Sequence, residues 1–402
     1  MLRHLANSVR NSWTKLSVLT LVCLGTSSAL ADGVIRDGLG AVSSGRGGTN
    51  IAHFDNGQIL LDNPAAMLNI EGTGLYEVGV DLLFTDLRYS DPDLVAGTNA
   101  ALKPMPLGQL AYITKSADGQ WAFGLGAFAP AGFAATYHLP GPTGIGGIQK
   151  YKSLGALGKI LPGVAYRVND RLSIGGTFGV AISHAELEGP FFIQTGAAAG
   201  TPTLLDLQAT GAAISWSFGM PYQLSEQTTI GLTYQSETRF HLNGFAYVEI
   251  PGFGQSRFDA EVDLDWPQSL GLGLRHELCP HRILSVDVIW FDWSQAFDTL
   301  NMKFTNASND DFTALLGSTI RDQFPLNWSD SVSLRVGYEH FVTPDCVLRA
   351  GYTYHPNPIP DNTLTPYIPA ILGTLFLSEL ERSGMISKWT SPTSTRSARI
   401  AA

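Results

Sequence analysis

Cysteine is scarce in this chain of 402 residues, which has only Cys23, Cys279 and Cys346. So few cysteines exclude a disulfide-dense secreted scaffold, in which bridges stand in for a hydrophobic core. Cys279 and Cys346 both lie beside predicted turns, and a bridge between them and two free thiols both remain open. Charged residues are scarce as well, at 15% of the chain, against about 25% in ordinary globular domains.

Long hydrophobic runs are also missing beyond residue 31, where no apolar stretch reaches the roughly 18 residues of a helical membrane span. The first 31 residues, by contrast, have the three parts of a secretory signal peptide. Basic residues come first, the apolar run "LSVLTLVCLG" follows, and Ala29-Leu30-Ala31 forms a cleavage site before Asp32. The alternative, a buried N-terminal helix, does not explain these parts together. We therefore predict export, with residues 1–31 as the signal peptide.

Basic residues are in deficit in the expected mature chain. Arg3, Arg10 and Lys15 leave with the signal, so that 22 basic and 35 acidic residues give 22 − 35 = −13. Nucleic-acid binding requires basic surfaces that neutralise phosphates. This charge therefore argues against nucleic acid as a partner.

What the sequence does contain is a two-residue period of polarity, which indicates β-strands with one apolar face. In "SVSLRVGYEHF" the apolar face consists of Val332, Leu334, Val336 and Tyr338, and the polar face of Ser333, Arg335, Gly337 and Glu339. A soluble sandwich also alternates. Three features favour a membrane barrel: strands of about 10 residues or more, short connections alternating with long ones, and aromatic residues at strand ends.

The pattern therefore predicts an all-β, transmembrane antiparallel barrel whose apolar face meets lipid and whose polar, glycine-rich face lines the lumen. Long connections are expected near 86–105, 132–152, 189–207, 246–257 and 298–329. About 11 strands are recognisable, near 73–85, 106–115, 121–133, 154–168, 171–188, 208–224, 228–245, 258–278, 282–297, 330–342 and 346–355. An odd number conflicts with single-chain bacterial barrels, whose strand number is even.

The segment "GLGAVSSGRGGTNIAHFDNGQILLDNPAAML" resembles the start of the FadL/TodX (OmpP1) family of outer-membrane transporters for long-chain fatty acids and aromatic hydrocarbons. Later stretches are similar in the same order, among them "WAFGLGAFAPAGFAATY", "ILPGVAYRVNDRLSIGGTFGV" and "LRAGYTYHPNPIPDNTLTPYIP". The similarity covers about residues 36–369. It implies a 14-stranded barrel over 73–369, preceded by an N-terminal plug over 32–72.

The end of the chain departs from the family pattern. After "TLTPYIP" the family has about three more strands, whereas residues 370–402 do not alternate and read as disordered. We interpret this tail as the product of a shifted reading frame or a truncated gene copy, unless strands have been overlooked. Unpaired strand edges in hydrocarbon cost several kcal/mol per group, so a truncated barrel would insert poorly.

The resemblance also implies a mechanism and its residues. Outer loops capture a hydrophobic molecule, the barrel interior takes it up, and a kink in the third strand opens the wall sideways. The plug motif is Asn63-Pro64-Ala65, where Asn63 suits an N-cap and Pro64 the first helical position. The kink residues are Gly126, Pro130 and Gly132, because proline lacks a ladder donor and glycine often marks a bulge. The alternative is that Pro130 ends the strand.

Polar candidates are weaker. Arg335 and Arg349 face the predicted lumen and suit a fatty-acid carboxylate, although pairing with Glu339 or Asp287 is the favoured role. In "HELCPH", the side chains of His276, Cys279 and His281 suit a metal ion, but solvated turn residues are the favoured reading. We expect no cofactor, no metal and no catalytic residue, since neither GxSxG nor HExxH occurs.

The favoured function is thus a channel for hydrophobic compounds. A barrel enzyme would need a Ser/His/acid trio that the sequence does not place. A surface receptor or adhesin, or a non-functional remnant, remain as alternatives. The partners implied are a hydrophobic small molecule, outer-membrane lipid and lipopolysaccharide, and the barrel assembly machinery, with the protein acting as a monomer.

Overall fold

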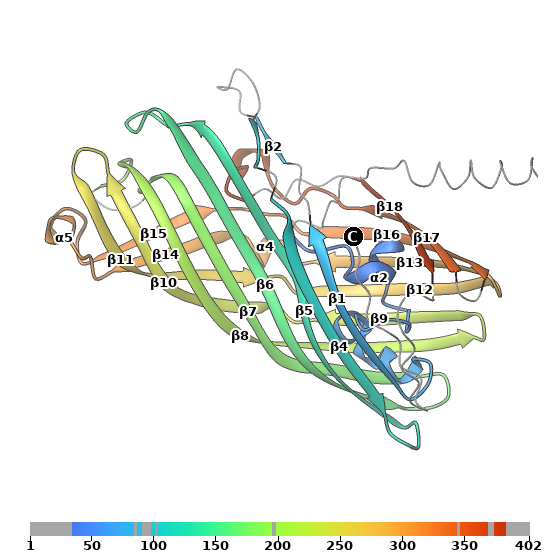
Figure 1. Ribbon diagram of the computed structural model, residues 1–402. Helices are drawn as coiled ribbons and strands as arrows, with labels where there is room; N and C mark the ends of the chain where they lie inside the picture. Colours follow the sequence, from blue (N-terminus) through green and yellow to red (C-terminus); the bar gives the residue numbers. More distant parts are fainter. Residues whose placement is uncertain are drawn as a thin grey trace, which may run out of the picture.

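The computed structural model describes residues 34–83, 87–90, 98–101, 103–194, 198–343, 346–368 and 374–382. The expected signal peptide and most of the expected tail lie outside these ranges. A single antiparallel sheet of 16 strands curves into an elongated barrel wall (Figure 1). Among the described residues, no helix has the length and apolar character that crossing a membrane requires.

The wall contains long strands joined at one end by tight turns. Its strands are β1 (Gly74–Leu83), β4 (Met105–Lys115), β5 (Trp121–Pro140), β6 (Ile148–Arg167), β7 (Ser173–Phe192), β8 (Pro202–Ser225), β9 (Thr228–Gln235), β10 (Thr238–Ile250), β11 (Gly254–Trp266), β12 (Ser269–Cys279), β13 (Arg282–Phe291), β14 (Thr299–Thr305), β15 (Thr319–Pro325), β16 (Ser331–Thr343), β17 (Cys346–Tyr354) and β18 (Thr374–Arg382). A separate hairpin pairs β2 (Arg88–Tyr89) with β3 (Thr98–Asn99).

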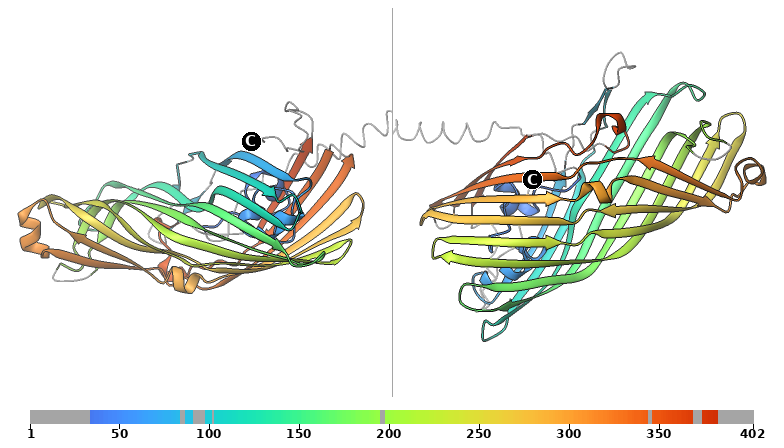
Figure 2. Two further views of the ribbon diagram at one scale, coloured as in Figure 1. Left: turned by 90° about the horizontal axis from the view of Figure 1, so that it is seen from below. Right: turned by 180° about the vertical axis from the view of Figure 1, so that it is seen from behind.

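Short helical pieces complete the described chain. They are α2 (Gly40–Gly45), α3 (Ile59–Asp62), η1 (Pro64–Asn69), α4 (Trp293–Ala296), α5 (Asp310–Leu316) and η2 (Asp361–Thr363). The first three belong to the N-terminal segment, defined here as Val34–Ile70. This segment lies inside the barrel near the tight turns, as Figures 1 and 2 show. Its side chains are largely buried against the inner face of the wall.

Four passes of the wall are interrupted at neighbouring points. β9 with β10, β11 with β12, β13 with β14, and β15 with β16 each follow one another along the same pass. Counting each of these four pairs once, the 16 strands make 12 passes. We call the level of these four interruptions the waist. The waist divides a short-turn half, which contains the N-terminal segment, from a long-loop half.

The twelfth pass is β18, which the sequence pattern did not predict. The expectation that the tail is disordered was wrong for residues 374–382, because they form a strand paired with β17. Within the described ranges β1 pairs only with β4, and β18 only with β17. The two edges of the sheet are therefore not joined by a strand ladder in this part of the chain.

Large apolar side chains cover the outside of the short-turn half. Phe178 is 64% exposed and Ile214 is 60% exposed, whereas Ser215 and Ser333 on the inner face are buried. This arrangement confirms the predicted assignment of the apolar face to the outside. Aromatic residues mark the ends of the apolar band, where Trp121 stacks on Tyr166 with ring centroids 4.7 Å apart and Trp216 on Tyr234 at 5.2 Å.

Several predicted long loops are in fact continuations of strands. Residues 246–257 contain the end of β10 and the start of β11, and residues 298–329 contain β14, α5 and β15. These extensions keep the two-residue period, but the polar residues now lie on the outer face and the apolar residues on the inner face. Along β7 the outward residues change from Val180 and Ile182 to Glu186 and Glu188, while inward positions change from serine to apolar residues such as Leu187.

Candidate functional site

A small cavity lies inside the barrel between the N-terminal segment and the waist. Its volume is about 70 Å³. By the same kind of measure one water needs about 10–15 Å³, so the cavity holds a few waters and no long-chain molecule. A larger ligand therefore requires a shift of the surrounding side chains. Its apolar lining includes Ile35, Ile51, Leu157, Trp266, Ile289 and Phe291.

Lys159 brings a buried positive charge to this cavity. The residue is 7% exposed, and its ammonium nitrogen donates to the neutral side-chain oxygen of Gln235 at 3.3 Å. Among the described residues, no carboxylate lies within ion-pair distance of it. Burying a charge without an opposite partner is costly. An anionic or hydrogen-bond-accepting head group would therefore be stabilised here, next to apolar walls.

Asp62 faces the same cavity from α3. One of its carboxylate oxygens accepts a hydrogen bond from the Asn50 side-chain amide at 2.8 Å. Burial raises the pKa of Asp62 to about 6, because removal from water disfavours the charged form more than the Asn50 bond and the Arg335 charge favour it. The cavity can therefore change its net charge in a mildly acidic medium.

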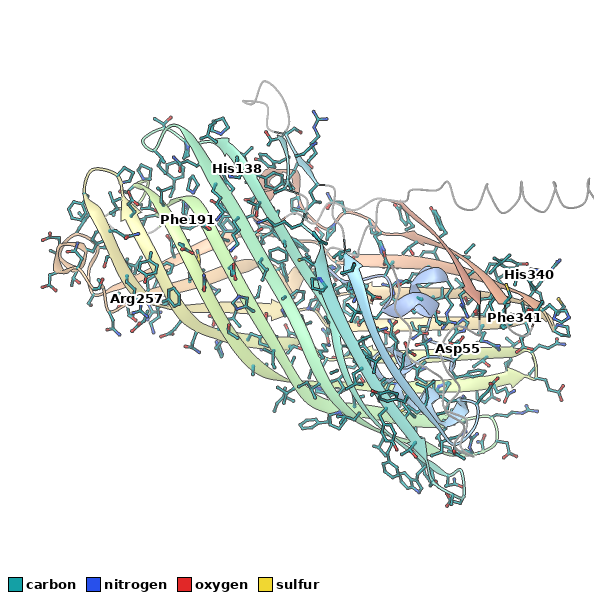
Figure 3. The ribbon with its side chains drawn as sticks, in the orientation of Figure 1. Asp55, His138, Phe191, Arg257, His340 and Phe341 are labelled. Atoms are coloured by element: carbon teal, nitrogen blue, oxygen red, sulfur yellow. The ribbon has the colours of Figure 1, made fainter. Side chains whose placement is uncertain are left out.

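A buried cluster of charges joins the N-terminal segment to the wall beneath the cavity. The Arg46 guanidinium donates to both carboxylate oxygens of Asp55 at 2.8 and 2.9 Å, and lies 3.3 Å from Glu339 on β16. Glu339 also accepts from Arg349 on β17 at 2.8 Å. Two guanidiniums thus face two carboxylates, and Figure 3 shows Asp55 within the short-turn half.

His53 completes this cluster. Its Nδ1 lies 3.7 Å from Glu339, and His53, Asp55 and Glu339 are grouped closely enough for a metal ion. Burial and the nearby Arg46 charge lower the pKa of His53 well below its usual value. The Arg46 charge also holds the pKa of Asp55 well below its usual range, despite burial. The arginine side chains already bond to the carboxylate oxygens and balance their charge. These residues therefore fit an ion-pair cluster that fixes the N-terminal segment to the wall better than a metal site.

A second set of contacts fixes the segment to β13 and β16. Asp287 accepts hydrogen bonds from the backbone N–H groups of Asn50 and Ile51 at 2.7 and 3.1 Å. Asp37 pairs with Arg335 at 3.5 Å and with His355 at 2.6 Å. All of these wall residues face inward. The polar luminal face therefore binds the N-terminal segment along several strands at once.

The Asn63-Pro64-Ala65 motif lies in the segment where the sequence predicts a short helical turn, but its details differ. An α-helical turn, α3, precedes Asn63, and the turn that Pro64 begins is a 3₁₀ helix. The Asn63 side chain makes no cap to nearby N–H groups; its amide donates instead to the Ile51 carbonyl oxygen at 2.7 Å. Ala65 is fully buried and approaches the wall at Gly175, where a Cβ atom would lie 2.9 Å from the Ala65 Cα.

The predicted kink residues lie within one long strand. β5 continues through Pro130 to Pro140, so proline does not end the strand. Its register against β6 shifts between Phe128 and Ala131, which is the signature of a β-bulge. Gly126 precedes the shift, where a Cβ atom would lie 2.3 Å from the Phe128 ring. A side chain at that position would collide with Phe128.

At the bulge, the edge of β5 that pairs with β4 changes its hydrogen-bond partner. The ladder between β4 and β5 ends at Ala127. From there the N-terminal segment takes the place of β4, because Arg36 N–H donates to the Pro130 carbonyl at 3.0 Å and Gly132 N–H donates to the Val34 carbonyl at 2.8 Å. Arg36 also forms an ion pair with Asp81 of β1. Three residues of the segment thus cover β5 at residues 130–132, just beyond the end of the β4 ladder.

Of the other polar residues predicted from the sequence, Arg335 lies at the cavity and the rest lie elsewhere. Arg335 lines the cavity, whereas Arg349 pairs with Glu339 outside it, as favoured from the sequence. The ion-pair partner of Arg335 is Asp37 and not Asp287. His276 bonds to Thr228 at 2.9 Å, and Cys279 and Cys346 are free. His276, Cys279 and His281 are not brought together as a ligand set among the described residues.

Sequence reasoning missed Lys159, Asp62 and Trp266 as cavity residues. Lys159 had a usable signal, because it interrupts the inward face of a strand whose inward neighbours are small or apolar. Asp62 and Trp266 had no usable sequence signal. A single acidic residue in a turn and a tryptophan at a strand end occur in many proteins without marking a cavity. Only the fold brings the N-terminal segment against the waist.

Comparison with known proteins adds to this geometry. The family described as outer membrane protein transport protein (OMPP1/FadL/TodX) matches residues 22–372. None of the curated proteins matches the chain. Several solved structures share its fold at low identity, and this likeness bears on the fold alone.

The toluene transporter TodX of Pseudomonas putida has a TM-score of 0.70 and 22% identity, covering 85% of this chain and 87% of TodX. The toluene transporter TbuX of Ralstonia pickettii has a TM-score of 0.65 and 21% identity, covering 80% and 87%. A FadL homologue of Pseudomonas aeruginosa has a TM-score of 0.63 and 19% identity, covering 87% and 86%.

Proposed function

Because the chain belongs to the OMPP1/FadL/TodX family of outer-membrane transport proteins, we propose that it is a channel that takes up hydrophobic small molecules. Long-chain fatty acids and aromatic hydrocarbons are the candidate substrates. The short-turn half spans the outer membrane, with its apolar face in contact with lipid. The long-loop half projects outward through the lipopolysaccharide layer. The barrel assembly machinery inserts the protein, which acts as a monomer without cofactor or catalytic residue.

The observation that carries this proposal is the exchange of faces at the waist. Above it, the inward residues of β8, β10 and β11 are mostly apolar. They include Leu207, Phe240 and Phe258, which are each at most 2% exposed. The outward residues there are polar or charged, such as Gln208 and Glu261. A greasy molecule gains free energy by leaving water for such an interior. The long-loop half is therefore suited to capture and shelter it.

The N-terminal segment acts as a plug in this proposal. It fills the lumen of the short-turn half, and the charge cluster around Arg46 anchors it to β16 and β17. A straight passage to the periplasm is then blocked. The Asn63-Pro64-Ala65 turn forms the base of the plug, where close packing against Gly175 leaves little space.

The exit proposed is sideways, at the β5 bulge. The ladder of β4 with β5 stops at Ala127, and only Val34–Arg36 covers the next stretch of β5. Withdrawal of these residues would open the wall beside Pro130, which also lines the cavity. The ligand would then enter the membrane without crossing the plug. Gly126 and Gly132 leave space for the backbone on either side of the bulge.

Uptake by cells tests the function. Cells that lack their own hydrophobic-compound channels, carrying either this gene or an empty vector, are given radiolabelled oleate and, separately, toluene. Faster accumulation of at least one probe with the gene supports the proposal. Equal rates for both probes, with the protein present in the outer membrane, would refute it.

The variant Lys159→Met tests whether the substrate carries a carboxylate head group. This substitution roughly keeps the length of the side chain and removes its charge. If the substrate is a carboxylate, this variant slows oleate uptake and leaves toluene uptake unchanged. Lys303→Met is a matched control, since Lys303 lies on the outside of β14 and pairs with Glu261. Unchanged oleate uptake in Lys159→Met would remove Lys159 from the substrate site.

A further inference from the structure

Trp266 makes a contact that passes through the lumen and not along the wall. Its indole Nε1–H donates to the Ser183 hydroxyl oxygen at 3.2 Å. Trp266 ends β11 and Ser183 lies on β7, and the sheet places β8 and β10 between these two strands. Both side chains are nearly inaccessible, at 2% and 0% exposure. This bond therefore links distant parts of the wall across the interior.

The local chain explains why the indole turns inward. Pro267 follows Trp266 and belongs to the interruption between β11 and β12, where proline cannot donate to a ladder. Behind the indole, Phe297 packs edge-on with ring centroids 6.1 Å apart, and Phe297 in turn stacks on Trp328 at 4.6 Å. Trp266 is therefore supported from one side by rings and held from the other by Ser183.

The position of this bond coincides with the change of polarity inside the barrel. Ser183 is the last hydroxyl on the inward face of β7, and Ala185 and Leu187 follow it. On β11 the inward residues before Trp266 are Val262 and Leu264, both buried and apolar. On its other side, Trp266 lines the cavity with Lys159. The indole thus separates the apolar interior of the long-loop half from the cavity.

We propose that Trp266 is the constriction between the apolar interior of the long-loop half and the cavity, and that the Ser183 hydroxyl keeps it closed. The inference rests on the proposed channel function and adds the residue that limits the size of what passes. A molecule moving inward must displace the indole, which requires breaking the hydrogen bond. Loss of the bond should therefore favour the open position of the ring.

Two single substitutions remove the same bond from opposite sides. Ser183→Ala removes the acceptor, and Trp266→Phe keeps an aromatic ring without the N–H donor. The matched control is Ser217→Ala, because Ser217 shares a 2.6 Å hydrogen bond with Thr177 on the same inner face, between neighbouring strands. Ser183→Thr keeps a hydroxyl at the constriction. Uptake of toluene and of the larger naphthalene is measured in cells for each variant.

We expect Ser183→Ala and Trp266→Phe each to raise naphthalene uptake relative to toluene by about two- to tenfold, the range that one net hydrogen bond allows. The double variant should show no further increase, since both changes remove one bond. Ser217→Ala should behave as wild type, and Ser183→Thr should restore most of the wild-type ratio.

The outcomes separate this inference from the proposed function. If the wild type takes up neither probe faster than empty-vector cells, the channel function for these probes fails. If the wild type takes them up but Ser183→Ala matches Ser217→Ala in its naphthalene-to-toluene ratio, the constriction is wrong and the channel stands. In the double variant, the naphthalene-to-toluene uptake ratio could also rise by the product of the two single-variant increases. That result would contradict the proposal, because it would show that the two substitutions do not act through one hydrogen bond.

Discussion

The two halves of this barrel belong to one sheet, in which strands such as β7 and β8 run through both halves, but their interiors differ. In the short-turn half the outer surface is apolar, and the inner face carries many small, polar or charged side chains beside an apolar cluster that packs on the N-terminal segment. In the long-loop half the outer surface is charged and the interior is apolar and aromatic (Figure 3 labels Arg257 and Phe191 in this half). A strand such as β7 passes through both environments without losing its period. The polarity of its side chains on each face matches the environment on that side of the wall.

The halves also use charge differently. The short-turn half buries its charges in paired clusters between the N-terminal segment and the wall, as at Arg46 and Glu339. The long-loop half keeps most of its charges on the surface, as at Arg239 and Glu237, although Asp322 of β15 is buried. Buried pairs are costly to break, whereas exposed pairs contribute little. The same kind of substitution should therefore have very different effects in the two halves.

The largest effect is expected for Arg46→Ala in the short-turn half. The change leaves Asp55 and Glu339 without their shared partner inside the barrel, which costs about 3–5 kcal/mol. The N-terminal segment should then become sensitive to added protease in detergent-solubilised protein. Arg239→Ala is the counterpart in the long-loop half and should leave the cleavage rate unchanged. Equal sensitivity of both variants would contradict the contrast in burial.

A lysine placed on the outer face tests which half meets lipid. Ile214 and Gln208 lie on the same face of β8, on opposite sides of the polarity change. Ile214→Lys should destabilise the folded barrel in vesicles by about 2–4 kcal/mol, the cost of a lysine near the bilayer midplane. Gln208→Lys should change the free energy of unfolding little, because its position is in water. Urea unfolding in vesicles measures both.

The pKa of Asp62 predicts a smaller effect that depends on pH. Its folded pKa, about 6, is above the ordinary value of 3.8, so its contribution to stability is complete below about pH 4 and is lost as pH rises through 6. The loss is at most roughly 3 kcal/mol, from a rise of (6 − 3.8) pKa units at about 1.36 kcal/mol each. Asp62→Asn should remove it, so the variant should gain stability over the wild type between pH 4 and 7. A constant difference across that range would show that the pKa is not raised.

The smallest effect concerns the two cysteines at the short-turn end. Cys279 and Cys346 are free, and neither takes part in the buried contacts that hold this half together. Replacing both by serine should leave the free energy of unfolding and the uptake rate unchanged, and reductant should not alter the wild type. A stability that falls on reduction would reveal a bridge.

The sequence predicted the strands of the short-turn half well, because large apolar residues stay on the outer face there and give one constant two-residue pattern. It failed where the environment changes. In "SHAELEG", from Ser183 to Gly189, the apolar residues move to the inward face, so the strand no longer shows a single apolar face. Parts of the long-loop half were therefore read as loops, namely residues 246–257, where β10 ends and β11 begins, and residues 298–329, which contain β14 and β15.

The site was predictable only in part. Arg335 was identified because it stands on the luminal face of a regular strand, and the Pro64 turn because proline at a first helical position is a local signal. The partner of the Asn63 side chain, the Ile51 carbonyl, depends on how the segment folds back on itself. The bond between Trp266 and Ser183 depends on curvature of the whole wall. Contacts of this kind have no local pattern.

The exchange of faces at the waist can be measured directly with spin labels in vesicles. In a protein with Cys279 and Cys346 replaced by serine, a nitroxide is attached to a single cysteine at position 214 or at position 208. Collision with oxygen, which concentrates in lipid, is compared with collision with a water-soluble nickel complex. The account predicts that oxygen dominates for the label that replaces Ile214 and the nickel complex for the label that replaces Gln208. The same preference at both positions would contradict it.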